Sequence, residues 1–409
     1  MTGARRGRAM RIAGGALALV LVGSVLLTYQ LLTRPFPGHN DFLTPWEASR
    51  LYFYEGLDPY SDAVSLRIQE RIFGRAALPD EQPNHFAYPL YAILFVWPVI
   101  HMDYAWASAI WMVAMEAALI GGLIALLALY RWRAHPITVA GLALFMLIVY
   151  PGARGLLLGQ VSHLVFALQA LALLALSRRR DRLAGVLLAL ATFKPQMVYL
   201  LVPPLLVWGL VTGRRAFVIA FAATLGALLA VSFALLPGWL AGFWHQLTLY
   251  PTYIEVSTPA WVIADRVIDA VLPGAGRPAE LILNALGLAL VAWAWFDVLA
   301  RGHHERAGWA VVLTLTMTHL IGLRTATPHF IVFAIPLVFY LRVLAAQRRG
   351  AAMVGLVAAL IALPWAHFLL TLGAGKFEHP SLFVPLPLLT LVVVWLTRRR
   401  WWAASSLLG

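Results

Sequence analysis

Apolar runs of about 20 residues recur from one end of the chain to the other, with short polar clusters between them. About 20 consecutive apolar residues are what an α-helix needs to cross the hydrocarbon core of a bilayer. A transmembrane β-barrel would show shorter segments of alternating hydrophobicity instead. The pattern therefore predicts an all-α polytopic membrane protein, with residues 1–409 as a single integral membrane domain. We expect about twelve transmembrane helices, at about 12–33, 104–130, 136–152, 156–177, 183–195, 197–212, 216–236, 280–300, 307–323, 328–342, 351–371 and 381–397.

Arginine clusters between the apolar runs indicate how the chain is oriented. They occur, for example, at residues 131–133, 178–182 and 398–400. Because cytoplasmic loops carry the excess of arginine and lysine, we expect both termini in the cytoplasm. Residues 34–87 and 237–279 then form a first and a second outer loop. Short surface helices are expected at 44–56 and 62–73, in the first outer loop.

Residues 88–102 are apolar but short for a membrane span. We interpret them as a re-entrant or interfacial helix. The alternative is a full span, which would put the cluster at residues 131–133 outside the cell.

Composition agrees with a membrane protein and limits the partners. Hydrophobic residues make up 61% of the chain and charged residues 12%, whereas a soluble domain carries about 25% charged residues. The net charge of +13 would suit nucleic acid, but the arginines lie in loops between spans, so we expect no nucleic-acid partner. The apolar stretch 12–33 is long enough to span, and no convincing small-x-small cleavage site follows it. We therefore interpret it as an uncleaved first helix.

Asp41 is the leading candidate for chemistry. It directly follows the first predicted span, in a chain with only 18 aspartate and glutamate residues. Ionisable groups close to the membrane are energetically expensive and mark functional sites. A carboxylate on the side away from the arginine clusters therefore predicts chemistry at the outer surface of the membrane.

Other polar side chains are expected at the same outer ends of the spans, and each has a structural alternative. Asp58 precedes proline and is also typical of a turn, and Arg154 is also able to reach lipid headgroups. Gln160 and His163 are equally suited to hydrogen bonds between helices. Lys194 lies beside Pro195 inside an apolar stretch, which favours an anionic ligand. The full set of candidates is Asp41, Asp58, Tyr60, Tyr88, Arg154, Gln160, His163, Lys194, Arg324 and His329.

The sequence gives little support for a cofactor. The chain has no cysteine, which excludes disulfides, a thiolate nucleophile and cysteine-ligated metal. No two of the candidate acids and histidines have metal-ligand spacing, so a divalent metal is only weakly supported and we predict no metal site. No glycine-rich phosphate loop occurs, which makes a soluble nucleotide-sugar donor less favoured.

Several segments, taken in order, resemble glycosyltransferase family 87. They are Asp41-Phe42, Gly56-Leu57-Asp58-Pro59-Tyr60, Phe86-Ala87-Tyr88-Pro89-Leu90, Gly159-Gln160-Val161-Ser162, Phe193-Lys194-Pro195-Gln196 and Thr327-Pro328-His329. The resemblance covers about residues 10–345. It implies a GT-C type helical bundle that transfers a hexose, mannose above all, from a polyprenyl-phosphate donor with inversion. The acceptor would be a lipid-linked saccharide or another glycan, with membrane lipids as the surroundings.

The resemblance also implies roles for the candidates. Asp41 takes the position of the general base that activates the acceptor hydroxyl. The leaving group is a phosphate and needs fixed cations, which Arg154, Lys194 and His329 would supply. The remaining candidates would bind substrate: Asp58, Tyr60, Tyr88, Gln160, His163 and Arg324.

Two other functions fit a polytopic protein with polar outer loops. A transporter or flippase of a lipid-linked saccharide would be expected to have charged or broken helices at the membrane midplane. An O-antigen polymerase or ligase also has many spans and large outer loops, but the acidic loop directly after the first span argues against it.

Overall fold

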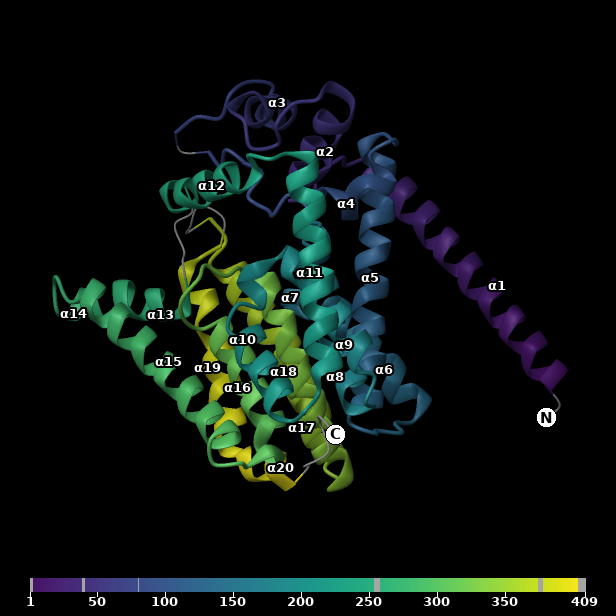
Figure 1. Cartoon of the computed structure of the whole chain (residues 1–409), viewed down its shortest axis with the longest axis vertical. Helices are drawn as coiled ribbons and strands as arrows, with labels where there is room; N and C mark the ends of the chain where they lie inside the picture. The colour runs from purple at the N-terminus through teal and green to yellow at the C-terminus, as the bar shows by residue number, and fades with distance from the viewer. Residues whose placement is uncertain (1–2, 39–40, 80, 254–257, 374–377, 404–409) are drawn as a thin grey trace.

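The structure is a computed structural model that describes residues 3–38, 41–79, 81–253, 258–373 and 378–403. Those residues form helices and connecting loops, with no β-strand among them. In the middle of the molecule α5 packs along α8, and α9 packs along α11 (Figure 1). These helices are α5 (Tyr104–Leu129), α8 (Ser162–Ser177), α9 (Asp181–Leu190) and α11 (Arg215–Leu235).

The polytopic membrane character predicted from the sequence is confirmed, whereas a count of twelve spans is not. Six helical segments within the described residues are long and apolar enough to cross a membrane. The pair α6 (Pro136–Ile148) and α7 (Tyr150–Leu157) is bent by 56° and would make a seventh. The other apolar runs form shorter helices, such as α8, α10 (Val202–Val211) and α16 (Ala307–Thr318). The long apolar runs of the sequence are therefore partly broken helices within the bundle.

The first span leaves the bundle at an angle. α1 (Gly3–Thr28) continues into η1 (Tyr29–Thr33) and diverges from the other helices (Figure 1). The ring of Tyr29 stacks on that of Trp106, with 3.6 Å between centroids, which ties the end of the span to α5. The start of α1 and α20 (Arg398–Ala403) both lie at the end of the molecule opposite to α2 and α3 (Figure 1).

Two helix breaks shape the centre of the protein. The predicted break near residue 152 lies instead at Val149, because Pro151 fits the first turn of a new helix and not the interior of an old one. The predicted break at Lys194 and Pro195 is confirmed: η3 (Ala191–Phe193) ends there and η4 (Pro195–Met197) begins. Gln169 donates from Nε2 to the carbonyl of Met197 at 2.9 Å, which satisfies one backbone group that this break leaves outside a helix.

Residues 88–102 form only α4 (Ala92–Val96) and η2 (Trp97–Val99). Both are too short to cross a bilayer. The structure therefore supports the interpretation of this segment as something other than a full span.

Both helices expected in the first loop are present, as α2 (Leu43–Glu55) and α3 (Asp62–Phe73). Ser61 caps α3 by accepting from the backbone N–H of Val64 at 3.3 Å, and Gly74 ends it with φ of 71°. The expectation that α2 is a surface helix is wrong. Leu43, Trp46 and most of its other side chains are buried, because α2 packs against α4 and η2.

We call α2, α3 and residues 86–93 the cap. Many of its side chains form a second hydrophobic cluster, completed by Trp239 of α12 (Trp239–Tyr253), whereas Leu43, Trp46 and Tyr91 belong to the main core. Tyr60 joins the cap to α12. Its carbonyl accepts from Nε2 of Gln246 at 2.9 Å, and its side chain lies against Gly242, where an added Cβ would come within 2.8 Å of the Cβ of Tyr60 and 2.9 Å of its ring.

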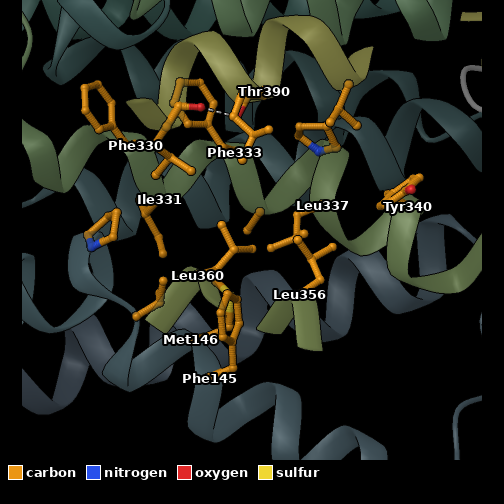
Figure 2. A pocket seen from close by; sticks show the side chains of 17 residues that line it. Phe145, Met146, Phe330, Ile331, Phe333, Leu337, Tyr340, Leu356, Leu360 and Thr390 are labelled. Atoms are coloured by element: carbon orange, nitrogen blue, oxygen red, sulfur yellow. Dashed lines mark hydrogen bonds between the residues drawn. The ribbon is translucent and has the colours of Figure 1, made fainter. Parts of the chain in front are cut away.

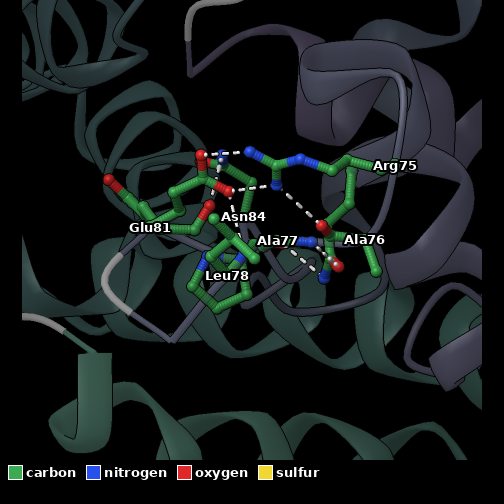
Figure 3. Close-up of polar contacts among 9 residues, drawn as sticks. Arg75, Ala76, Ala77, Leu78, Glu81 and Asn84 are labelled. Atoms are coloured by element: carbon green, nitrogen blue, oxygen red, sulfur yellow. Dashed lines mark hydrogen bonds and ion pairs between the residues drawn. The ribbon is translucent and has the colours of Figure 1, made fainter.

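Figure 3 shows how the loop after α3 is closed by charged groups. Arg75 donates from Nη1 and Nη2 to the two carboxylate oxygens of Glu81, at 2.7 and 2.9 Å. Glu81 also accepts from the backbone N–H of Leu78 at 2.8 Å. These hydrogen bonds lower the pKa of the Glu81 carboxyl to about 2.

The second half of the chain contributes the buried centre and the last loop. α16 is buried along almost its whole length. The other elements are α13 (Pro259–Val262), η5 (Ile263–Ile268), α14 (Asp269–Val271), α15 (Gly276–Leu299), η6 (His304–Arg306), η7 (Thr327–Phe333), α17 (Ala334–Ala346), α18 (Gly350–Leu370), η8 (Pro380–Phe383) and α19 (Pro385–Leu396).

Candidate active site

Asp41 is held in place by its own backbone and by the residue after it. Its N–H donates to the carbonyl of Leu158 at 2.9 Å. The ring of Phe42, 1% exposed, stacks on that of Trp111 of α5 with 4.6 Å between centroids. Trp111 in turn donates from Nε1 to the carbonyl of Gly159 at 2.9 Å. Asp41 is therefore fixed against the loop that joins α7 to α8.

Gln160 of that loop connects Asp41 to Lys194. Its Nε2 donates to Oδ2 of Asp41, and its Oε1 accepts from Nζ of Lys194. Gly159 precedes it with φ of 64°, a left-handed conformation that suits glycine and turns the chain here. Three residues predicted from the sequence thus form one hydrogen-bonded chain, although they come from three distant segments.

The charged groups of Asp41 and Lys194 are largely removed from water. Lys194 is 2% exposed, whereas Asp41 keeps partial exposure. Burial raises the pKa of the Asp41 carboxyl, and the charge of Lys194, the hydrogen bond from Gln160 and the charge of Arg154 offset part of that effect. Within the described residues, no hydrogen bond reaches the other oxygen of Asp41, Oδ1. One carboxylate oxygen is therefore oriented and the other is available to a ligand.

A second polar group surrounds Arg154 on α7. Its Nε donates to Oε1 of Glu378 at 3.1 Å. Tyr150 donates to the same carboxylate oxygen, and Oγ1 of Thr327 lies 2.8 and 2.9 Å from the two oxygens. The charges of Arg154 and Glu378 both act on Asp41, so this group and the chain through Gln160 belong to one electrostatic site.

His163, His319 and His329 interact electrostatically with Lys194, and the hydrogen bond described for Lys194 goes to Gln160 and not to a histidine. His163 pairs through Nε2 with the carbonyl of Gly152 at 2.9 Å and joins α7 to α8. Nδ1 of His329 lies 3.2 Å from Oγ1 of Thr325, which lies 3.3 Å from Nδ1 of His319. The charge of Lys194 acts on both His319 and His329.

The structure places three predicted substrate-binding residues in the first loop or the cap. Asp58 is exposed and its Oδ1 accepts from the backbone N–H of Tyr60 at 2.9 Å, as in a turn. Tyr60 is buried and donates from its hydroxyl to the carbonyl of Tyr88 at 2.7 Å. Their described contacts hold the first loop and the cap together and do not involve Asp41, Gln160 or Lys194. Arg324 lies partly buried at the entry to η7.

Sequence reasoning missed four residues of the site, namely Tyr150, His319, Thr327 and Glu378. Glu378 had a signal: it is an acid in a chain poor in acids, and it stands just before the last apolar run. His319 had one as well, because it lies inside an apolar run, where an ionisable side chain is expensive. Thr327 stands in the segment Thr327-Pro328-His329, of which only His329 was made a candidate. Tyr150 had no signal, since a hydroxyl in such a position also occurs without a functional role.

An apolar cavity of about 110 Å³ is lined in part by Pro151 of α7 and Phe330 of η7, the two helices that also carry Arg154 and Thr327. Figure 2 shows side chains from α6, η7, α17, α18 and α19 around it, with Thr390 and Tyr340 as the polar ones. Val149 and Pro151, which flank Tyr150, contribute to its wall.

The described part of the chain contains no group of three or more acidic or histidine side chains placed to hold a metal ion.

The family model of glycosyltransferase family 87 matches residues 86–321. Gln160, His163, Lys194 and His319 lie within the match, whereas Asp41 and Glu378 lie outside it. No curated protein and no solved structure matches the chain.

Proposed function

Because the chain belongs to glycosyltransferase family 87, we propose that it transfers a hexose, with mannose as the first candidate, from a polyprenyl phosphate. The acceptor is a lipid-linked saccharide or another glycan, and the reaction takes place on the outer face of the membrane. The bundle is then of the GT-C type, with both termini in the cytoplasm. The observation that carries this proposal is the chain from Asp41 through Gln160 to Lys194, next to Arg154.

Asp41 acts as the general base in this proposal. An acceptor hydroxyl hydrogen-bonded to Oδ1 gives its proton to the carboxylate as its oxygen attacks the anomeric carbon. Gln160 keeps the carboxylate in position from the other side through Oδ2. Since the raised pKa comes from burial, Asp41 is also a stronger proton acceptor than an exposed aspartate.

Lys194 and Arg154 serve the leaving group. The bond from the anomeric carbon to the phosphate oxygen breaks, and its electron pair leaves with the phosphate. Single displacement inverts the anomeric carbon and needs only one carboxylate. Fixed cations in a site poor in water stabilise the charge that develops on the phosphate. His329, which interacts electrostatically with Lys194, adds a polar group to this side of the site.

The apolar cavity supports a lipid donor over a soluble one. Its lining includes Val149 and Pro151, the sequence neighbours of Tyr150, whose hydroxyl belongs to the Arg154 group. We assign to it the part of the polyprenyl chain nearest the phosphate. Asp58, Tyr60, Tyr88, His163 and Arg324 remain candidates for shaping the acceptor side.

The test is transfer of mannose from polyprenyl-phosphate-mannose to candidate acceptors by the purified protein, with Asp41→Asn beside it. Loss of the base is expected to lower kcat by roughly 10²–10⁴-fold. Asp62→Asn is the matched control, because Asp62 is exposed at the start of α3. Undiminished activity of Asp41→Asn refutes the role of Asp41. Accumulation of the lipid-linked sugar in proteoliposomes without bond cleavage would indicate a transporter.

A further inference from the structure

Glu378 is bound to the site by three side chains from two elements. Arg154 and Tyr150 of α7 contact Oε1, and Thr327 of η7 contacts both oxygens. Its side chain is 10% exposed. A largely buried carboxylate with this many partners has a fixed orientation, because moving it would leave Arg154 and two hydroxyl groups without this partner.

The contact with Arg154 uses only part of the guanidinium. Arg154 donates from Nε alone, and among the described residues its Nη1 and Nη2 have no hydrogen-bond or ion-pair partner. The guanidinium also lies over the ring of Phe368, 5.7 Å from its centroid. An arginine whose Nε is hydrogen-bonded to a carboxylate has Nη1 and Nη2 left as a pair of donors, which is an arrangement that binds phosphate oxygens.

The charges of the site balance without a ligand. Lys194 and Arg154 are two cations, and Asp41 and Glu378 are two anions that act on the same centre. An arriving phosphate therefore meets the attraction of Arg154 reduced by the repulsion of Glu378. The hold of Glu378 on Arg154 therefore favours phosphate binding, whereas the negative charge of Glu378 disfavours it.

We propose that Glu378 is a positioning residue: it holds Arg154 by Nε so that Nη1 and Nη2 bind the donor phosphate, while its own charge limits the affinity for that phosphate. This inference rests on the proposed function. The limit is useful to a transferase, because the polyprenyl phosphate left after transfer has to leave the same site.

Two substitutions separate the two effects. Glu378→Gln keeps an oxygen for Arg154 and Tyr150 and removes the charge, so it is expected to tighten binding of polyprenyl phosphate about three- to tenfold. Glu378→Ala removes the hydrogen bonds to Arg154, so it is expected to weaken that binding about tenfold or more. Binding of polyprenol, the same chain without phosphate, is the control and is expected to stay unchanged in both variants.

The outcomes are distinguishable by titrating purified protein with polyprenyl phosphate and with polyprenol. Opposite shifts of the two variants, confined to polyprenyl phosphate, support the proposal. If both variants bind polyprenyl phosphate as the parent does, or weaken both lipids equally, Glu378 has no positioning role and the proposal is overturned. If the parent itself does not prefer polyprenyl phosphate over polyprenol, the donor of the proposed function is wrong.

Discussion

Gln160→Glu tests whether the hydrogen-bonded chain through Gln160 governs the protonation of Asp41. The change places a carboxylate at hydrogen-bond distance from Asp41, where the wild-type amide donates. Two like charges about 4 Å apart at an effective dielectric constant of about 20 repel by about 4 kcal/mol, which corresponds to about three pKa units. Lys194, which donates to residue 160, offsets part of this repulsion. We therefore expect the pKa of the carboxyl pair to rise by about one to two units.

The measurement is kcat/KM for sugar transfer as a function of pH. A protonated Asp41 cannot accept the proton of the acceptor, so activity falls as the pH falls through its pKa, and the acid limb of Gln160→Glu should lie at higher pH by that amount. The double variant Asp41→Asn/Gln160→Glu restores the net charge and both hydrogen bonds while moving the carboxylate. It should unfold at the parent's temperature and stay inactive. An acid limb that coincides with the parent's, or an active double variant, would refute the reasoning.

Three further predictions concern stability. Gly185→Ala should lower the free energy of unfolding by about 1–3 kcal/mol, because the added Cβ would lie 2.3 Å from the carbonyl oxygen of Phe217 and force α9 and α11 apart. Gly226→Ala is the control and should not lower it, because the space around Gly226 is open. Unfolding in denaturant compares the two variants. Tyr60→Phe should lower the free energy of unfolding by about 1 kcal/mol through the lost hydrogen bond to the carbonyl of Tyr88 and leave the KM for the acceptor unchanged. A raised acceptor KM at unchanged stability would instead place Tyr60 in substrate binding. Because the pKa of Glu81 is lowered to about 2, its carboxylate stabilises the loop above the ordinary pKa of 4.5 and loses that effect as the pH falls towards 2. Cleavage of this loop by pepsin, compared with cleavage of Glu81→Gln at the same pH, should be slower at pH 4 and approach the rate of the variant at pH 2.

The helices were predictable where local chemistry decides them. The predicted helix at 62–73 coincides with α3, since Ser61 and Gly74 are typical of helix ends. Lys194 beside Pro195 predicted a broken helix, and the break is there. The burial of α2 was not predictable, because lipid and protein interior are equally apolar and the pattern of side chains is the same for both.

The site was predictable in its types of residue and not in its pairings. Asp41, Gln160 and Lys194 stood out as polar groups beside apolar runs, and the structure joins them. The partner of Arg154 was missed, because Glu378 lies 224 residues further along the chain and no periodicity connects two such positions. Contacts of this kind depend on how helices are arranged in space, which the spacing of residues does not encode.

That separation has a consequence for how the protein is made. Synthesis proceeds at roughly 5–20 residues per second, so Arg154 leaves the ribosome roughly 10–45 s before Glu378. During that interval Arg154 lacks Glu378, the carboxylate that accepts from its Nε in the folded protein, and only Asp41 of the two acids of the site has been made. The site is therefore completed only when the last loop is inserted, and a nascent chain that stalls before residue 378 holds most of the bundle without a finished centre.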